Sequence, residues 1–417
     1  MRESQQLRRR HVWPVVVVVG LVTIPMIGGA LLESLGGSTK AAVYASVGDE
    51  LTVYSVDVDG AALTKQQTIT LPGFAQEAWA GATPYIYVAW SSGGSSYAGS
   101  GVTPTNKHGI SAFHVDPATG ALRAQGSPAM LRARPIYITG DIPGRHLLVA
   151  YNDPSGISVH AINGDGSIGA EVPQPGNLDV GIYGHQVRVM ASNRSVILVT
   201  RGNQATATTT EDPGAVKLFR YDDGKLANVA SIAPSSGIAF RSRHLDFHPT
   251  RPWIFLSLES QNRLQMYNIK GDALSSAPVF SKSTLASGGG EEPGQAASTV
   301  HVHPNGQVVY VGNRNGNPAE THGSNDIAVF RINQDTGEPT LVQNIDTHGI
   351  TPRTFSIDPT GRLLVVGNQT TTDGPSGVPA NLAVFRIKSD GRLEFARRYD
   401  VASGKKPLWW TGFVELR

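Results

Sequence analysis

One structural unit recurs seven times along this chain of 417 residues, and this repetition limits the fold more than any other feature. The clearest copy, Ser298 to Leu341, contains the apolar stretches VHVH, QVVYVGN and DIAVFRI, followed by a fourth, with turns of Pro, Asn, Asp and Gly between them. Val, Ile, Tyr and Phe favour strands, and these turn residues supply the backbone angles of tight turns. One copy therefore predicts a four-stranded antiparallel sheet, which buries too little apolar area to be stable alone.

The third strand of the unit recurs as LTVYSV, ISAFHV, ISVHAI, VKLFRY, LQMYNI, IAVFRI and LAVFRI. Sheets that repeat in this way bury both faces when they pack radially, and only short edges remain exposed. We therefore expect an all-β, seven-bladed β-propeller of four-stranded antiparallel blades over residues 41–417. The aligned positions of the seven strands are Tyr54, Phe113, His160, Phe219, Tyr267, Phe330 and Phe385.

The two ends of the repeat region are complementary. The first copy lacks its first strand, because AVYASVGDELTVYS begins with the second one. The chain ends in KKPLWWTGFVELR, which can supply the missing strand. We predict that Leu408 to Phe413 forms the innermost strand of the first blade and closes the ring, and that Trp409 and Trp410 belong to the core.

Residues 1–40 differ in kind from the repeats. Arg8, Arg9 and Arg10 precede an apolar run from Val15 to Leu32, which is the layout of an export signal or of a membrane anchor. Both interpretations place the propeller outside the cytoplasm, as an exported (periplasmic or extracellular) or membrane-anchored domain.

The composition excludes several classes of function. The formal net charge is +2, whereas nucleic-acid binding requires a basic face or stripe, so no nucleic-acid partner is expected. The chain has no cysteine, which removes disulfides, thiol nucleophiles and thiolate metal sites. No spacing of His, Asp and Glu predicts a metal site, although loop carbonyls could bind calcium. We expect no cofactor, and a monomer.

A second regularity concerns the first two strands of each copy, where two positions lie 16 residues apart. These strands form a hairpin, so the start of the first and the end of the second lie at the same edge of the sheet, opposite the turn. The first strand is innermost, so these positions are predicted to converge around one mouth of the central channel. The pairs are His185 with Arg201, Arg243 with Glu259, Ser298 with Arg314, and Arg353 with Gln369, and the third blade offers Ile136 with Asn152.

Four arginines at one mouth favour an anionic ligand, because the guanidinium group presents a planar fork to carboxylate or phosphate and stays charged. Glu259 and His185 are the groups of this set that can move protons near neutral pH. Together they suit ester or lactone hydrolysis, in which one residue activates water and an arginine stabilises the oxyanion. The structural alternative is that the charges pair and cap the channel. His248 and His303 lie in HP turns, which predicts a turn role for both.

The segments HPNGQVVYVGNRN, DIAVFRINQDTGEPTLV, RHLDFHP and PRTFSIDPTGRLLVVGNQ resemble the seven-bladed propeller lactonase family, which includes bacterial 6-phosphogluconolactonases and fungal carboxy-cis,cis-muconate cyclases. The likeness covers about residues 41–417. It implies a catalytic set of His185, Arg243, Glu259 and Arg314 in the central cleft. The remaining residues of the spacing pattern, Arg201, Ser298, Arg353 and Gln369, would then bind substrate.

The sequence departs from the family pattern at three positions. Tyr183 stands where the family has a second histidine, Thr299 where it has Glu, and Arg201 where it often has Asp. These altered charges bear on the identity of the substrate more than on the fold. The leading hypothesis is therefore hydrolysis of an anionic sugar or aliphatic lactone, and the alternatives are a muconate cyclase-like cycloisomerase and an exported propeller that binds a ligand or partner without catalysis.

Overall fold

The computed structural model describes residues 40–81, 83–93, 106–316, 323–369, 378–404 and 406–417. The chain divides into two units, Met1–Ser38 and Thr39–Arg417, and the described residues belong to the second. The predicted leader falls on residues outside this description. Within the described part of the chain, no helix combines the length and the apolar character needed to cross a membrane.

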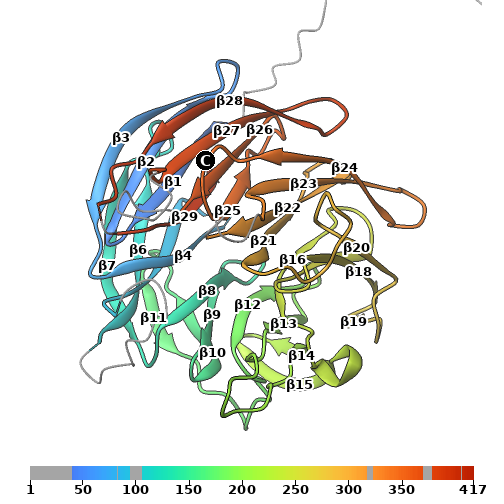
Figure 1. Cartoon of the computed structure of the whole chain (residues 1–417). Helices are drawn as coiled ribbons and strands as arrows, with labels where there is room; N and C mark the ends of the chain where they lie inside the picture. The colour runs from blue at the N-terminus through green and yellow to red at the C-terminus, as the bar shows by residue number, and fades with distance from the viewer. Residues whose placement is uncertain (1–39, 82, 94–105, 317–322, 370–377, 405) are drawn as a thin grey trace, which may run out of the picture. The chain divides into compact units, whose positions relative to one another are not determined.

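The described residues form seven antiparallel sheets arranged in a ring, which confirms the predicted propeller (Figure 1). A short 3-10 helix, Pro234–Gly237, lies between the fourth and fifth sheets in sequence. From the innermost strand outward, the first four blades are β29 (Leu408–Glu415), β1 (Ala41–Val47), β2 (Glu50–Asp57) and β3 (Ala62–Thr70); β4 (Phe74–Ala80), β5 (Tyr85–Ser91), β6 (His108–Val115) and β7 (Leu122–Leu131); β8 (Pro135–Gly140), β9 (His146–Asn152), β10 (Ser155–Ile162) and β11 (Ile168–Glu171); and β12 (Gly184–Val189), β13 (Ser195–Thr200), β14 (Ala215–Asp222) and β15 (Lys225–Ile232).

The fifth blade differs from the others at its outer edge, where β18 pairs with two short strands in place of one long strand. The last three blades are β16 (Ser242–Phe247), β17 (Trp253–Leu258), β18 (Arg263–Lys270), β19 (Ala273–Leu274) and β20 (Phe280–Ser283); β21 (Gln295–Val302), β22 (Val308–Asn315), β23 (Asp326–Ile332) and β24 (Pro339–Asp346); and β25 (Pro352–Ile357), β26 (Leu363–Asn368), β27 (Asn381–Ile387) and β28 (Leu393–Asp400).

The ring is closed by the C-terminal strand, as predicted. β29 pairs antiparallel with β1, with Val43 opposite Phe413, and it extends two residues past the predicted end, to Glu415. The first blade therefore combines the two ends of the propeller domain in one sheet. Unfolding of either end removes strand pairing from the other.

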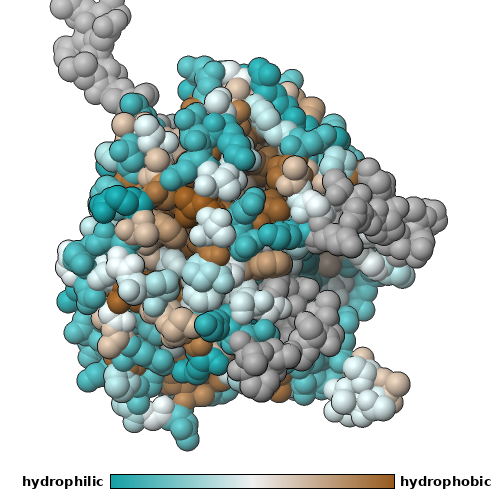
Figure 2. Space-filling model, turned by 90° about the vertical axis from the view of Figure 1, so that its left-hand side faces the viewer, coloured by the Kyte–Doolittle hydropathy of each residue, from teal (hydrophilic) through white to brown (hydrophobic). Residues whose placement is uncertain are grey.

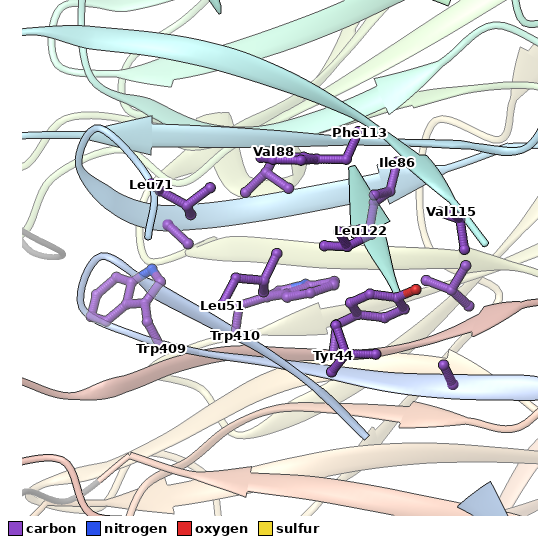
Figure 3. Packing of buried hydrophobic residues seen from close by; sticks show 14 residues of the cluster. Tyr44, Leu51, Leu71, Ile86, Val88, Phe113, Val115, Leu122, Trp409 and Trp410 are labelled. Atoms are coloured by element: carbon purple, nitrogen blue, oxygen red, sulfur yellow. The ribbon is translucent and has the colours of Figure 1, made fainter. Parts of the chain in front are cut away.

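The core consists of apolar clusters between neighbouring blades. The seven aligned third-strand positions lie on β2, β6, β10, β14, β18, β23 and β27, and all but the half-buried Tyr54 are buried. Figure 3 shows the cluster between the first two blades, in which Trp409 and Trp410 pack with Leu51, Leu71 and Tyr44. The side formed by these blades shows hydrophilic and hydrophobic residues interspersed, with hydrophobic residues in view across its upper half (Figure 2).

The turns between the two innermost strands connect successive blades. His248 donates from Nε2 to the Gly306 carbonyl of the next blade at 2.8 Å, and His303 donates to the Gly361 carbonyl at the same distance. In each turn the other ring nitrogen, Nδ1, accepts a backbone N–H, which in the second turn comes from Asn305 at 3.1 Å. The predicted turn role of both histidines is confirmed.

At the opposite edge, every innermost strand contains a β-bulge. The register of each innermost strand against its neighbour shifts at the same place, which leaves extra residues out of the pairing. A bulge bends the strand and re-aims the side chains beside it, and bulges are common next to active sites. The bulged residues are Trp409, Gln76, Ile136, His185, Arg243, Ser298 with Thr299, and Arg353.

Candidate functional site

The bulged edge gathers charged residues from separate blades. Glu259, which follows β17, accepts from Arg201 Nη1 at 3.2 Å and from Arg314 Nη2, and its Oε1 lies 3.7 Å from Arg243 Nε. We call Arg201, Arg243, Arg314 and Arg353, together with Glu259, the guanidinium cluster. Three of the four guanidinium groups share this one carboxylate, so the cluster carries an excess of positive charge.

Arg353 completes the cluster without an ion pair among the described residues. Its guanidinium stacks 3.6 Å from the centre of the Trp409 ring, and Arg201 lies in the same way 4.0 Å from Tyr183. Burial, followed by the neighbouring Arg314, lowers the pKa of Arg353 below its ordinary value. Aromatic faces therefore hold the two guanidinium groups by cation–π contact, with their hydrogen-bonding edges left for other partners.

Several donors of the cluster lack a partner among the described residues. They include Nε of Arg243, of Arg314 and of Arg353, and each is buried. Arg243 is only 1% exposed, and burial together with Arg314 and Arg353 lowers its pKa well below the ordinary value. Buried donors without acceptors are rare in folded proteins and call for an explanation. A bound anion would satisfy these donors and relieve the repulsion between the guanidinium groups.

His185 lies beside the cluster. Its ring is 5.0 Å from that of His244, and its Nδ1 has no partner among the described residues. Burial, and then Arg243, lower the pKa of His185 well below 6.5, and the pKa of His244 is lowered for the same reasons. Both imidazoles are therefore neutral at neutral pH, and a neutral imidazole has one nitrogen that can accept a proton.

The carboxylate of Glu259 is held in its charged form. Burial alone would raise the pKa of Glu259, but Arg314, Arg201 and Arg243 outweigh burial and hold the pKa far below its usual range. A carboxylate with such a low pKa is a weak base. Its role in this geometry is to hold three guanidinium groups together.

A cavity of about 210 Å³ occupies the central channel, and all seven innermost strands contribute to its wall. The residues that follow the bulges line it, because a bulge disturbs the usual alternation of side chains along a strand. Most of these residues are polar and of different types. They are Glu77, Tyr137, Gln186, His244, Thr299, Thr354 and Trp410.

The predicted residues separate into two groups. His185, Arg201, Arg243, Glu259, Arg314 and Arg353 interact with one another. Ser298, by contrast, is fully buried, and its hydroxyl lies 2.9 Å from the Pro352 carbonyl and 3.0 Å from that of Gly312. Gln369 is half-buried after β26, with its backbone N–H bonded to the Thr351 carbonyl. A substrate-binding role for Ser298 would require its present bonds to open.

Sequence reasoning missed polar residues of the second, third and fifth blades. Buried Arg134, which precedes β8, donates from Nε to Gln76 at 2.9 Å, and Gln76 is the bulged residue of β4. Extension of the spacing pattern to the second blade would have found Gln76. Glu77 and His244 were missed because strand alternation places consecutive side chains on opposite faces, and only the bulge turns the next one toward the channel.

A metal centre has no support in the described part of the chain. No three His, Asp or Glu side chains there gather closely enough to hold a metal ion. The cluster of guanidinium groups would also repel a cation.

A family model and similar relatives of this chain agree on one family. A family model described as "Lactonase, 7-bladed beta-propeller" matches residues 75–403. The 6-phosphogluconolactonase of Bacillus subtilis is 27% identical over 292 residues, covering 68% of this chain and 75% of the relative. The 6-phosphogluconolactonase of Yersinia pestis is 26% identical over 375 residues, covering 89% and 97%.

Solved structures agree on the fold. The periplasmic gluconolactonase of Pseudomonas aeruginosa superposes with a TM-score of 0.67 and 18% identity, over 91% of this chain and 100% of that one. A putative 6-phosphogluconolactonase from Bacteroides fragilis superposes with a TM-score of 0.66 and 16% identity, over 92% and 100%. These identities are low enough that the structural likeness concerns the fold alone.

Proposed function

The chain belongs to the lactonase family of seven-bladed β-propellers, and we propose that it hydrolyses an anionic lactone of the 6-phosphogluconolactone type. The main support is the guanidinium cluster, in which three of the four arginines share one carboxylate and three buried Nε atoms have no hydrogen-bond partner among the described residues. Arginine pairs with phosphate and carboxylate through parallel hydrogen bonds, so an anionic group on the substrate suits this cluster.

The arginines would serve both binding and catalysis. Arg353 and Arg314 bind the anionic group of the substrate, and Arg243 stabilises the oxyanion that forms when water attacks the lactone carbonyl. Removal of one such donor from an enzyme typically lowers the rate by about 10²–10³-fold. Because Arg243 is buried and flanked by two other arginines, its charge is little screened by water.

His185 is the better candidate for the base. Its ring is neutral and Nδ1 has no hydrogen-bond partner among the described residues, whereas Glu259 is occupied by three guanidinium groups. An anionic substrate next to the arginines would cancel part of the positive potential that lowers the pKa of His185. The base therefore becomes stronger when substrate is bound, and water is activated mainly in the complex.

Turnover of a panel of lactones by the purified domain tests this function. The panel contains 6-phosphogluconolactone, the same lactone without phosphate, and a carboxylated aliphatic lactone. We expect the phosphorylated or carboxylated lactones to have the higher kcat/KM and to yield the hydroxy acid. Interconversion of lactone and unsaturated acid without uptake of water would instead identify a cycloisomerase.

Anion binding is measured separately from turnover. Inorganic phosphate is expected to raise the melting temperature of the wild type, and to do so less in Arg353→Met, because a ligand that binds only the folded state stabilises it. Stabilisation by phosphate with no turnover of any lactone would favour the binding-protein alternative. No stabilisation and no turnover would reject the anionic site.

The location of the protein is a further part of this proposal. The residues before the propeller have the layout of an export signal or a membrane anchor, so the domain would act outside the cytoplasm. Fractionation of cells that express the full chain tests this, with a chain that begins at residue 40 as the control.

A further inference from the structure

Glu77 is a second acidic residue of the channel, and the proposed function leaves it without a role. It follows the bulged Gln76 on β4, so it lies one position deeper than the level occupied by His185, Arg243 and Arg353 on their strands. It lines the channel cavity and is half-buried. Its carboxyl group is therefore surrounded by protein but open to the cavity.

The surroundings of Glu77 differ from those of Glu259. Among the described residues, no Arg or Lys forms an ion pair with Glu77. Its Oε1 accepts a long hydrogen bond, 3.3 Å, from the Ala78 N–H, and the Trp410 side chain also hydrogen-bonds to the carboxyl group. The other side chains of this cavity are mostly neutral, and they come from the remaining innermost strands. They are Tyr137, Gln186, His244, Thr299, His301, Thr354 and Trp410.

We propose, on the basis of the lactonase function, that Glu77 is a catalytic residue that donates a proton to the ring oxygen of the lactone as the carbon–oxygen bond breaks. The proposed function supplies a base for the attacking water and arginines for the oxyanion, but no donor for the leaving alkoxide. Glu77 is the carboxyl group that lines the channel cavity below the guanidinium cluster.

The titration behaviour of the two carboxyl groups agrees with this geometry. Burial raises the pKa of Glu77 to about 8, while the Ala78 N–H, Arg353, Trp410 and Arg243 oppose it only in part. The arginines hold Glu259 ionised, as described above. Two nearby carboxyl groups whose pKa values are pushed apart are typical of separate acid and electrostatic roles.

The reaction balances with the groups present. Water attacks the carbonyl carbon, its proton passes to the imidazole of His185, and the oxyanion forms beside Arg243. The carbon–oxygen bond then breaks, the ring oxygen takes its electron pair, and Glu77 supplies the proton that makes it a hydroxyl group. The new carboxylic acid returns a proton to Glu77 and His185 releases its proton to solvent, so one proton is released for each lactone opened.

The test compares leaving groups in wild type and Glu77→Gln. An aliphatic anionic lactone expels an alkoxide, which requires a proton, whereas a carboxylated dihydrocoumarin expels a phenolate, which leaves readily without one. In Glu77→Gln, we expect kcat/KM to fall about 10²-fold or more on the aliphatic lactone and much less on the dihydrocoumarin. Glu77→Asp should restore part of the loss, and Glu338→Gln, at an exposed ion pair with Lys282, should change neither rate.

A second measurement does not depend on turnover. A folded-state pKa raised to about 8 means that, as pH rises from about 4.5 to about 8, the unfolded chain releases a proton that the folded chain retains. Wild type should therefore lose thermal stability relative to Glu77→Gln across that window. His244, His301 and Tyr137 also line the cavity, and the charges of Arg243 and Arg353 act on Glu77. All five are common to both chains, so the difference between the chains reports mainly on Glu77.

The outcomes separate the two proposals. Active wild type with equal losses on both lactones, or with no loss in Glu77→Gln, would overturn the role of Glu77 and leave the lactonase function standing. A stability difference that does not change with pH would also overturn it, because Glu77 would then be ionised at neutral pH. If wild type opens no lactone, both proposals fail, whatever the stability measurement shows.

Discussion

Each innermost hairpin has a turn edge, where its two strands are joined, and a bulge edge at the other end. The histidines at the turn edge are fully hydrogen-bonded, whereas several polar groups at the bulge edge are not. At the turn edge, His248 and His303 use both ring nitrogens in hydrogen bonds to backbone groups. At the bulge edge, His185 has an unpartnered Nδ1, and three arginines have unpartnered Nε atoms among the described residues. Both edges contain buried histidine, yet of these three histidines only His185 leaves a ring nitrogen without a partner among the described residues.

This difference separates structural from functional polar groups. A histidine that satisfies two backbone groups contributes to stability, since an unsatisfied buried group costs about 1–3 kcal/mol. A cluster of like charges destabilises the fold, and it persists because the surrounding blades determine its geometry. Changes at the turn edge should therefore affect stability, and changes at the bulge edge should affect activity.

The largest expected effect comes from removal of the strand that contributes to both the ring closure and the bulge edge. Deletion of residues 408–417 removes β29, which pairs with β1 and carries Trp409 and Trp410 into the first core cluster. We expect the shortened chain to show no cooperative thermal transition in circular dichroism. Removal of Arg417 alone, beyond β29, is the control, and an unchanged melting temperature after the full deletion would contradict the closure.

The next effect concerns the bulge edge. Arg243→Gln is expected to lower kcat/KM by about 10²–10³-fold through loss of oxyanion stabilisation. Its melting temperature should change little, because the substitution also removes a buried like charge. Arg251→Gln, at the exposed turn edge, is the matched control and should leave kcat/KM unchanged. Full activity in a destabilised Arg243→Gln protein would show that the cluster is structural.

A smaller effect is expected at the turn edge. His303→Ala leaves the Gly361 carbonyl and the Asn305 N–H without their partner, which should cost about 1–3 kcal/mol. In a domain of this size each kcal/mol corresponds to about 2–4 °C or less in melting temperature. The value of kcat/KM at a temperature well below melting should match that of wild type. A loss of activity without a loss of stability would remove the distinction between the two edges.

The smallest effect lies in the pH profile. Burial and Arg243 lower the pKa of His185, so it stays neutral as pH falls through 6.5, and kcat/KM should be nearly flat between pH 7.5 and 6 in wild type. In Arg243→Gln the pKa of His185 should rise, and the acidic limb should move to higher pH. An acidic limb centred at or above 6.5 in wild type, or an unmoved limb in the variant, would argue against His185 as the base.

Much of the fold followed from the sequence because the repeats are local. The alternation of strand and turn residues predicted the blades, and the missing strand of the first copy predicted its replacement by the C-terminal strand. The 16-residue spacing selected positions of the bulge edge without knowledge of the bulges. It succeeded for His185, Arg243 and Arg353, which are bulged residues.

The 16-residue spacing was less informative in the sixth blade, where the bulge contains two residues. In β21 two residues leave the pairing, and Ser298 bonds to backbone carbonyls of its own and the next blade. Trp409 and Trp410 belong to the core as predicted, but Trp409 also stacks on Arg353 and Trp410 lines the cavity. Sequence alone could not separate these uses, because each depends on which neighbour lies opposite.

The sequence by itself determined the seven blades, the closing strand and the arginine-rich edge, since each follows from the repeated order of strands and turns. Only the tertiary structure decided which charges pair, which donors stay free, and that Glu77 faces the cavity beneath the guanidinium cluster. The physical reason is that ionisation depends on burial and on charges within a few ångströms, and in this protein those charges come from different blades.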